Sequence, residues 1–110
     1  MSGNKPSRDV FDAIADPTRR RIIQLLAEKG ELPLHQLTAQ FSIGRTAVSK
    51  HLKILKEAGL VVDRKAGRET RYRLNAFPLK KVQDWVTYYS VFWSANMSRL
   101  DQFLKEEKEE

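Results

Sequence analysis

The chain has 110 residues, a formal net charge of +6 and no cysteine, so disulfides, thiolate metal ligands and cysteine nucleophiles are excluded. Hydrophobic residues make up 41% and charged residues 31% of the sequence, which is typical of a soluble globular chain and too apolar for a disordered one. No stretch has the apolar core of a signal peptide or the length of a membrane span, so we expect a cytoplasmic protein with no membrane partner.

Four helices are predicted in the first half of the chain. Apolar residues at helical spacing define their approximate ranges, which are 8–15, 17–29, 34–41 and 45–58. Asp16 is expected to cap the second helix, with Pro17 at its first position, and Gly30 and Gly59 are expected to end the second and fourth helices. A three-residue turn that ends in glycine separates the third helix from the fourth, which is typical of a helix-turn-helix.

A β-hairpin and a long helix are predicted to follow. Residues 61–65 and 70–74 have the character of strands and flank a turn at 66–69. Helical spacing returns at Leu79 and persists to about Leu104. The fold class is therefore mainly α with a small β-hairpin (α+β), a winged helix-turn-helix with the element order α-α-α-α-β-β-α.

The net positive charge lies in one segment. Residues 45–73 contain nine Lys and Arg against three Asp and Glu, and the rest of the chain has eleven of each sign. A surplus confined to the fourth helix and the hairpin favours a polyanionic partner over general solubility.

The fourth helix has an apolar side and a basic side. At about 100° per residue, Val48, Leu52 and Leu55 cluster on one side, and His51 lies beside them. The other side collects Arg45, Thr46, Ser49, Lys50, Lys53, Lys56 and Glu57. A solvated helix surface typically mixes glutamate and lysine in i,i+4 pairs. Basic and small hydroxyl residues suit contacts to phosphates and base edges instead, so this side favours DNA recognition.

The hairpin adds further basic residues. Arg64, Lys65 and Arg68 are expected at or near its tip, where a wing can reach a phosphate backbone or the minor groove. Alternation along the second strand places Arg71 and Arg73 on the same face. Charges on such a strand also discourage aggregation between strand edges. Contact with DNA is favoured for Lys65 and Arg68 over Arg73.

A family resemblance covers roughly residues 9–75. It is carried by DPTRRRIIQLLAEKGELPLHQL and TAVSKHLKILKEAGLVVDRKAGRETRYRLN, which resemble the ArsR family of bacterial winged-helix repressors. The resemblance implies a homodimer that binds a palindromic operator in double-stranded DNA and blocks transcription. It also implies that the positions reading the major groove are Arg45, Thr46, Ser49 and Lys50. His51 matches a histidine common in the family, and we expect it to pack and form hydrogen bonds.

The metal sites of the family have no counterpart in the sequence. One family site uses a cysteine pair in a pattern like ELCVCDL, where this chain has ELPLHQL with Pro33 and His35. A second family site uses Asp and His on the last helix, which has no histidine here. We expect His35 to be a surface residue and the protein to have no metal and no cofactor. The chain is more similar to the metal-free members, some of which are autorepressors, and the inducing ligand or partner protein stays open.

The last helix carries a broad apolar stripe. At about 1.5 Å per residue it would be close to 40 Å long, more than one small domain can cover. A two-fold dimer would bury the uncovered aromatic residues. The expected interface residues are Trp85, Tyr89, Phe92, Trp93, Met97 and Leu100. A ligand pocket among these aromatics stays open.

Other functions fit the sequence less well. The chain has no phosphate-binding loop, nucleophile elbow or metal motif, so we do not expect an enzyme. RNA binding is disfavoured because Tyr72 is the one aromatic residue in the basic segment. A winged helix acting mainly through protein–protein contact is the alternative. We expect one domain over 1–110, with a DNA-binding core at 8–78, a dimerisation helix at 79–105 and flexible ends at 1–7 and 106–110.

Overall fold

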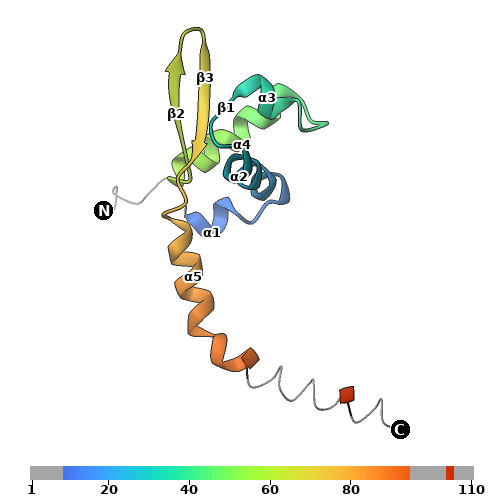
Figure 1. Ribbon diagram of the computed structural model, residues 1–110, viewed down its shortest axis with the longest axis vertical. Helices are drawn as coiled ribbons and strands as arrows, with labels where there is room; N and C mark the ends of the chain where they lie inside the picture. Colours follow the sequence, from blue (N-terminus) through green and yellow to red (C-terminus); the bar gives the residue numbers. More distant parts are fainter. Residues whose placement is uncertain (1–8, 95–103, 106–110) are drawn as a thin grey trace. The chain divides into compact units, whose positions relative to one another are not determined.

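The computed structural model describes residues 9–94, 104 and 105, and the chain divides into two compact units, Met1–Lys80 and Lys81–Glu110. The elements labelled in Figure 1 are α1 (Val10–Ala13), α2 (Pro17–Lys29), β1 (Leu32–Pro33), α3 (Leu34–Thr38), α4 (Arg45–Glu57), β2 (Val61–Ala66), β3 (Glu69–Leu74) and α5 (Leu79–Tyr88). The predicted α+β class and the winged helix-turn-helix order are confirmed.

Local sequence signals set the ends of the two longest helices of the first unit. The side chain of Asp16 accepts a hydrogen bond from the backbone N–H of Arg19 at 3.1 Å, and Pro17 is the first residue of α2. Gly30 ends this helix with a φ of 81°, a conformation that favours glycine. Gly59 follows α4 with a φ of 79°. The caps and helix ends predicted for these two elements are confirmed.

The other two helices are shorter than predicted. Helix α1 begins at Val10 and ends at Ala13, and α3 ends at Thr38 rather than near residue 41. The backbone N–H of Phe41 bonds to the carbonyl of Thr38 at 3.1 Å, three residues earlier. This spacing belongs to a turn and not to an α-helix, so an apolar residue at helical spacing is insufficient to extend the helix there.

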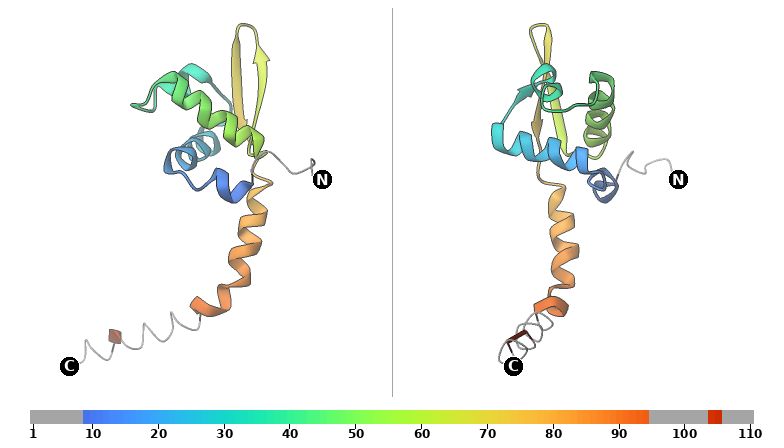
Figure 2. Two further views of the ribbon diagram at one scale, coloured as in Figure 1. Left: turned by 180° about the vertical axis from the view of Figure 1, so that it is seen from behind. Right: turned by 90° about the vertical axis from the view of Figure 1, so that its right-hand side faces the viewer.

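The hairpin belongs to an antiparallel sheet of three strands in the order β1-β3-β2. Its register pairs Val61 with Leu74 and Ala66 with Glu69. The third strand, β1, was not predicted. It has two residues, and Pro33 is acceptable there because β1 is an edge strand. The β2–β3 hairpin extends beyond the helices of its unit in the views of Figures 1 and 2.

An apolar core joins the elements of the first unit. Among the described residues, no polar or charged residue is buried as a whole, although the hydroxyl oxygen of Thr38 is buried without a hydrogen-bond partner. Apart from Pro33 of β1, the buried residues are Val10, Ala13, Ile22, Leu25, Leu26, Leu37, Val48, Leu52, Leu55, Leu60 and Val61. Because α4 contributes Val48, Leu52 and Leu55 to this core, as predicted, its basic side is directed away from the core.

Helix α5 is interrupted, and the prediction of one continuous helix to about Leu104 is wrong at this point. The helix ends at Tyr88, and residues 90–94 are helical again. Tyr89 and Phe92 each donate a backbone hydrogen bond to the carbonyl three residues earlier, at 3.0 Å. The Ser90 hydroxyl also donates to the Thr87 carbonyl at 2.8 Å, and such side-chain bonds compete with the helical backbone pattern.

No helix in the described part of the chain is long and apolar enough to cross a membrane.

Candidate nucleic-acid interface

The outward side of α4 carries the predicted recognition residues. Arg45, Thr46, Lys50 and Lys53 are exposed, and Ser49 is half-buried. They lie opposite the buried apolar stripe because the helix repeats every 3.6 residues. Four predicted contact residues are therefore accessible to a large partner, and the fifth is partly accessible.

The two faces of the hairpin carry different residues. Cross-strand pairing joins Lys65 to Thr70, and the next pair, Arg64 and Arg71, lies on the opposite face. Pairing of Val62 with Arg73 continues this second face. The register therefore separates Lys65 from three of the four wing arginines, those at 64, 71 and 73.

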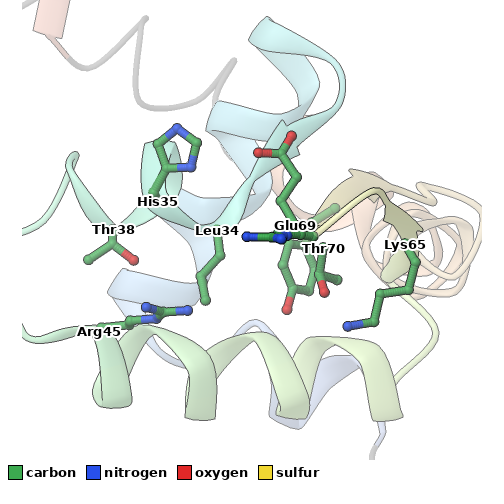
Figure 3. Close-up of a pocket in the computed structure, with 9 residues that line it drawn as sticks. Leu34, His35, Thr38, Arg45, Lys65, Glu69 and Thr70 are labelled. Carbon is green, nitrogen blue, oxygen red and sulfur yellow. The ribbon is translucent and has the colours of Figure 1, made fainter.

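A groove lies between α3, the start of α4 and the hairpin, with a volume of about 500 Å³. Its lining residues are Leu34, His35, Thr38, Arg45, Lys65, Arg68, Glu69, Thr70 and Tyr72. Figure 3 shows the side chains of Arg45 and Lys65 extending into this space from opposite sides. The groove thus brings together cations from the recognition helix and the wing, which are 20 residues apart in sequence.

Ion pairs engage three of the nine basic residues of the segment 45–73. Lys56 contacts Asp63 at 3.0 Å, and Arg71 contacts Glu69 at 2.7 Å. Arg64 makes two hydrogen bonds to the Glu31 carboxylate, at 2.8 and 2.7 Å. Within residues 9–94, 104 and 105, six cations of the segment have no ion pair: Arg45, Lys50, Lys53, Lys65, Arg68 and Arg73. All five cations predicted to bind DNA belong to this group.

The charges around the wing also shift its titratable groups. The hydrogen bond from Arg64 lowers the pKa of Glu31 and outweighs the opposing effect of desolvation. Burial raises the pKa of Tyr72, and the nearby Asp63 raises it further, while Lys56 and Arg45 oppose the shift. Tyr72 therefore keeps its proton at neutral pH and contributes a neutral hydroxyl to the groove.

The two histidines have different surroundings. His51 is half-buried, and its Nδ1 lies 3.2 Å from Nη1 of Arg19, which confirms the predicted packing and hydrogen bonding. His35 is exposed, as expected for a surface residue. No group of three or more His, Asp or Glu side chains that could hold a metal ion occurs among the described residues.

The predicted interface aromatics of the second unit are accessible to solvent. Trp85, Tyr89, Phe92 and Trp93 are between 38% and 61% exposed. Trp85 and Tyr89 make an edge-to-face contact with ring centroids 5.4 Å apart. Met97 and Leu100 lie outside the described residues. Sequence reasoning missed Tyr88, which is 75% exposed and packs edge-on against Tyr89.

Two side chains that make long-range contacts to α4 and the wing were also missed by the sequence-based prediction. Glu31 binds Arg64, 33 residues away, and Arg19 contacts His51, 32 residues away. Periodicity and capping are local signals and do not report such pairs.

Comparison with known proteins gives consistent matches. A family model described as "Bacterial regulatory protein, arsR family" matches residues 16–62. The uncharacterized HTH-type transcriptional regulator YuzN of Bacillus subtilis is 39% identical over 93 residues, covering 78% of this chain and 99% of YuzN. The transcriptional repressor SdpR of Bacillus subtilis is 37% identical over 78 residues, covering 71% of this chain and 86% of SdpR. A solved structure of an ArsR-like transcriptional regulator from Rhodococcus sp. RHA1 has a TM-score of 0.68 and 30% identity, with 88% of each chain covered.

Proposed function

The chain belongs to the ArsR family of bacterial regulatory proteins and is a transcriptional regulator, and we propose that it is a homodimeric repressor of its own or a neighbouring operon. In this proposal it binds a palindromic operator in the cytoplasm, where the DNA is, and does not sense a metal. Residues 8–78 bind DNA, and residues 79–105 form the dimer.

The observation that carries the proposal is which basic residues of the segment 45–73 have an ion pair and which have none. Three cations on the outward side of α4 (Arg45, Lys50 and Lys53) and two on the groove face and tip of the wing (Lys65 and Arg68) have no ion pair among the described residues. Unpaired Lys and Arg on one surface are the electrostatic footprint of a nucleic-acid binder, because phosphate contacts release condensed counterions. An ordinary solvated surface would mix the two signs more evenly.

The two elements have separate roles in the proposed complex. Helix α4 lies in the major groove, where Arg45, Thr46, Ser49 and Lys50 contact base edges. Charged and hydroxyl side chains make the hydrogen bonds that distinguish base pairs there. The phosphate contacts are made by Lys53 on α4 and by Lys65 and Arg68 on the wing. Phosphate contacts fix the register of the protein on DNA but carry no base information directly.

The exposed aromatics of the second unit support a homodimer. Trp85, Tyr89, Phe92 and Trp93 are residue types enriched at protein interfaces. A two-fold dimer presents two copies of α4, which explains why a palindromic operator would suit the protein. Met97 and Leu100 belong to the same proposed interface.

Absence of metal sensing is proposed from the ligand chemistry of the sequence. The chain contains no cysteine and two histidines, and metal sensing needs several soft or imidazole ligands at one place. Zinc, cadmium or arsenite at one equivalent should leave the protein–DNA complex intact. Release of the DNA that a chelator reverses would contradict this part of the proposal.

The proposed function is tested by comparing two duplexes. One is selected by the protein from a random-sequence library, and the other has the same composition in scrambled order. We expect the selected duplex to bind at least about 10³-fold more tightly at physiological salt, with affinity for both falling as salt rises. Equal affinity for the two duplexes would contradict sequence-specific regulation and favour a winged helix that acts through protein–protein contact.

A further inference from the structure

Arg19 is a point where three helices of the first unit are joined by hydrogen bonds. Its Nε donates to the carbonyl of Ala13 at 2.7 Å, and its Nη2 donates to the carbonyl of Asp12 at 3.3 Å. Both carbonyls belong to α1, whereas Arg19 belongs to α2. Its Nη1 lies 3.2 Å from Nδ1 of His51, in the middle of α4. One guanidinium therefore contacts the end of α1 and the recognition helix at once.

The chemistry of the guanidinium fixes the direction of the contact to α4. Arginine has five N–H donors in a rigid plane and no acceptor. Nδ1 of His51 must therefore accept the hydrogen bond, which places the ring proton of the neutral imidazole on Nε2. A lysine at position 19 would keep the charge, but its single nitrogen on a flexible stem cannot reproduce the planar fork.

The position of His51 on α4 gives the contact its significance. Buried apolar side chains hold α4 against the core and set which side of it faces outward, but the hydrophobic effect is itself non-directional. A hydrogen bond at the edge of the apolar stripe is directional. His51 follows Lys50 directly in the sequence, so a rotation of α4 that breaks the His51 bond also displaces the proposed base contacts.

We propose that Arg19 and His51 are positioning residues, which hold α4 at a fixed rotation against the α1–α2 turn and thereby set the preference for particular base pairs. The inference rests on the proposed function for its effect on DNA, while the contact itself is independent of DNA. Neither residue needs to touch DNA for this role, since His51 is half-buried and Arg19 is directed to α1 and α4.

The first arm of the test measures the contact without DNA. Urea unfolding is compared for the intact protein, Arg19→Lys, His51→Phe and the double variant. Phe keeps a ring at position 51 but has no acceptor. If the two residues act as one unit, the double variant is less destabilised than the two single effects combined. Additive effects would overturn the inference.

The second arm measures DNA preference on the selected and scrambled duplexes. His51→Phe and Arg19→Lys should each lower the ratio of the two affinities about 2- to 30-fold, the range typical of residues that couple sites without touching the ligand. The dependence on salt should be unchanged, because no phosphate contact is lost. His51→Asn should keep much of the affinity ratio of the intact protein. Asparagine carries the acceptor Oδ1 on Cγ, the carbon that carries Nδ1 in histidine. Arg21→Lys is the matched control, because Arg21 lies on α2, is exposed and contacts Gln24 within the same helix.

The outcomes separate the two proposals. An unchanged affinity ratio in His51→Phe overturns the positioning role while leaving the proposed function intact. A loss of ratio that Asn restores, with Arg21→Lys behaving as the intact protein, supports it. If the intact protein itself does not distinguish the duplexes, the proposed function fails, and the unfolding cycle decides whether Arg19 and His51 hold α4.

Discussion

Neighbouring acids divide the basic residues of the segment 45–73 into two groups. Lys56 and Arg71 have acidic partners within the segment, and Arg64 has one in Glu31. Lys50 and Lys65 have none among the described residues. A cation that is already paired must give up that partner to bind a phosphate, so its net gain on binding is smaller. Individual contributions to DNA binding should therefore differ among lysines that look equivalent in the sequence.

Lys50→Ala should weaken recognition of one base pair in each half-site. We expect a loss of about 1–3 kcal/mol per half-site on the selected duplex and a relaxed preference at that position. Binding to scrambled DNA should change much less. Lys29→Ala is the control, because Lys29 is exposed at the end of α2 and its substitution removes the same charge. An unchanged ratio of affinities in Lys50→Ala would show that Lys50 does not read bases.

Asp16→Ala should destabilise the fold by about 0.5–2 kcal/mol through loss of the α2 cap. The pKa of Asp16 is lowered in the folded protein: burial raises it, but the hydrogen bond from the Arg19 backbone is the first of several effects that together outweigh this. A lowered pKa contributes stability that is present above the ordinary aspartate value of about 3.9 and is lost as the pH falls through the folded value. Urea unfolding between pH 7 and pH 3 measures both effects. The difference in free energy of unfolding between the intact protein and Asp16→Ala should shrink as the pH falls. A difference that grows would contradict the lowered pKa of Asp16.

At the scale of elements, we propose that one face of the wing binds DNA and that the other is structural. Lys65 lies on the face that lines the groove, and the tip carries Arg68. On the opposite face, Arg64 is bound to Glu31, which directly precedes β1. Since β1 also pairs with β3, this ion pair is a second link between the hairpin and the segment after α2. We infer that it orients the wing.

Lys65→Ala and Arg64→Ala form a matched pair on adjacent positions of β2. Lys65→Ala should weaken both duplexes alike and reduce the slope of log affinity against log salt by about 0.9 for each lost phosphate contact, or about 1.8 for a dimer. Arg64→Ala should leave that slope nearly unchanged, since Arg64 is engaged by Glu31. Titrations at four or more salt concentrations measure the slopes. Equal losses of slope in the two variants would contradict the prediction that Lys65 contacts a phosphate and Arg64 does not.

The sequence predicted those elements whose signals are local. Asp16, Pro17 and Gly30 mark both ends of α2, and the 3.6-residue pattern of α4 separates its buried stripe from its basic side. Strand β1 was missed because two residues contain no period, and its pairing with Tyr72 and Arg71 depends on the tertiary fold. The break at Tyr89 was missed because its flanking residues continue the apolar spacing.

For the candidate site too, the sequence predicted the local features but not the long-range contacts. Composition and spacing identified the cations of α4 and the wing. Their division into paired and unpaired groups was not predictable, because the decisive partner of Arg64 lies 33 residues away in sequence. The contact between Arg19 and His51 depends on the packing of α2 against α4 for the same reason. Long-range pairs of this kind follow from the fold and not from periodicity.

At the scale of the whole molecule, the proposal requires two chains. The second unit exposes Trp85, Tyr89, Phe92 and Trp93, and large clusters of exposed apolar side chains typically mark interaction sites. A single recognition helix contacts only a few base pairs. Pairing of two copies therefore accounts for both the exposed aromatics and the specificity that a repressor needs.

The double variant Trp85→Ala/Phe92→Ala should dissociate the dimer. Sedimentation equilibrium of the intact protein at micromolar concentration should give twice the chain mass of 12.7 kDa. Truncation of buried interface aromatics commonly costs about 2 kcal/mol or more each, so the variant should be largely monomeric at that concentration. Phe77→Ala is the control, because Phe77 is an exposed aromatic residue of the first unit and lies outside the proposed interface. An intact protein that sediments as a folded monomer would refute the proposed assembly.

Footprinting of the protein on its selected duplex tests the central claim most directly, because it reports symmetry, groove and spacing together. We expect two equal protected patches related by the centre of the palindrome, with half-sites about 10–10.5 base pairs apart or a multiple of that distance. Methylation of guanine N7 in the major groove of either half-site should block binding, since α4 is proposed to lie there. A single protected patch, or binding that is insensitive to major-groove methylation, would contradict the account.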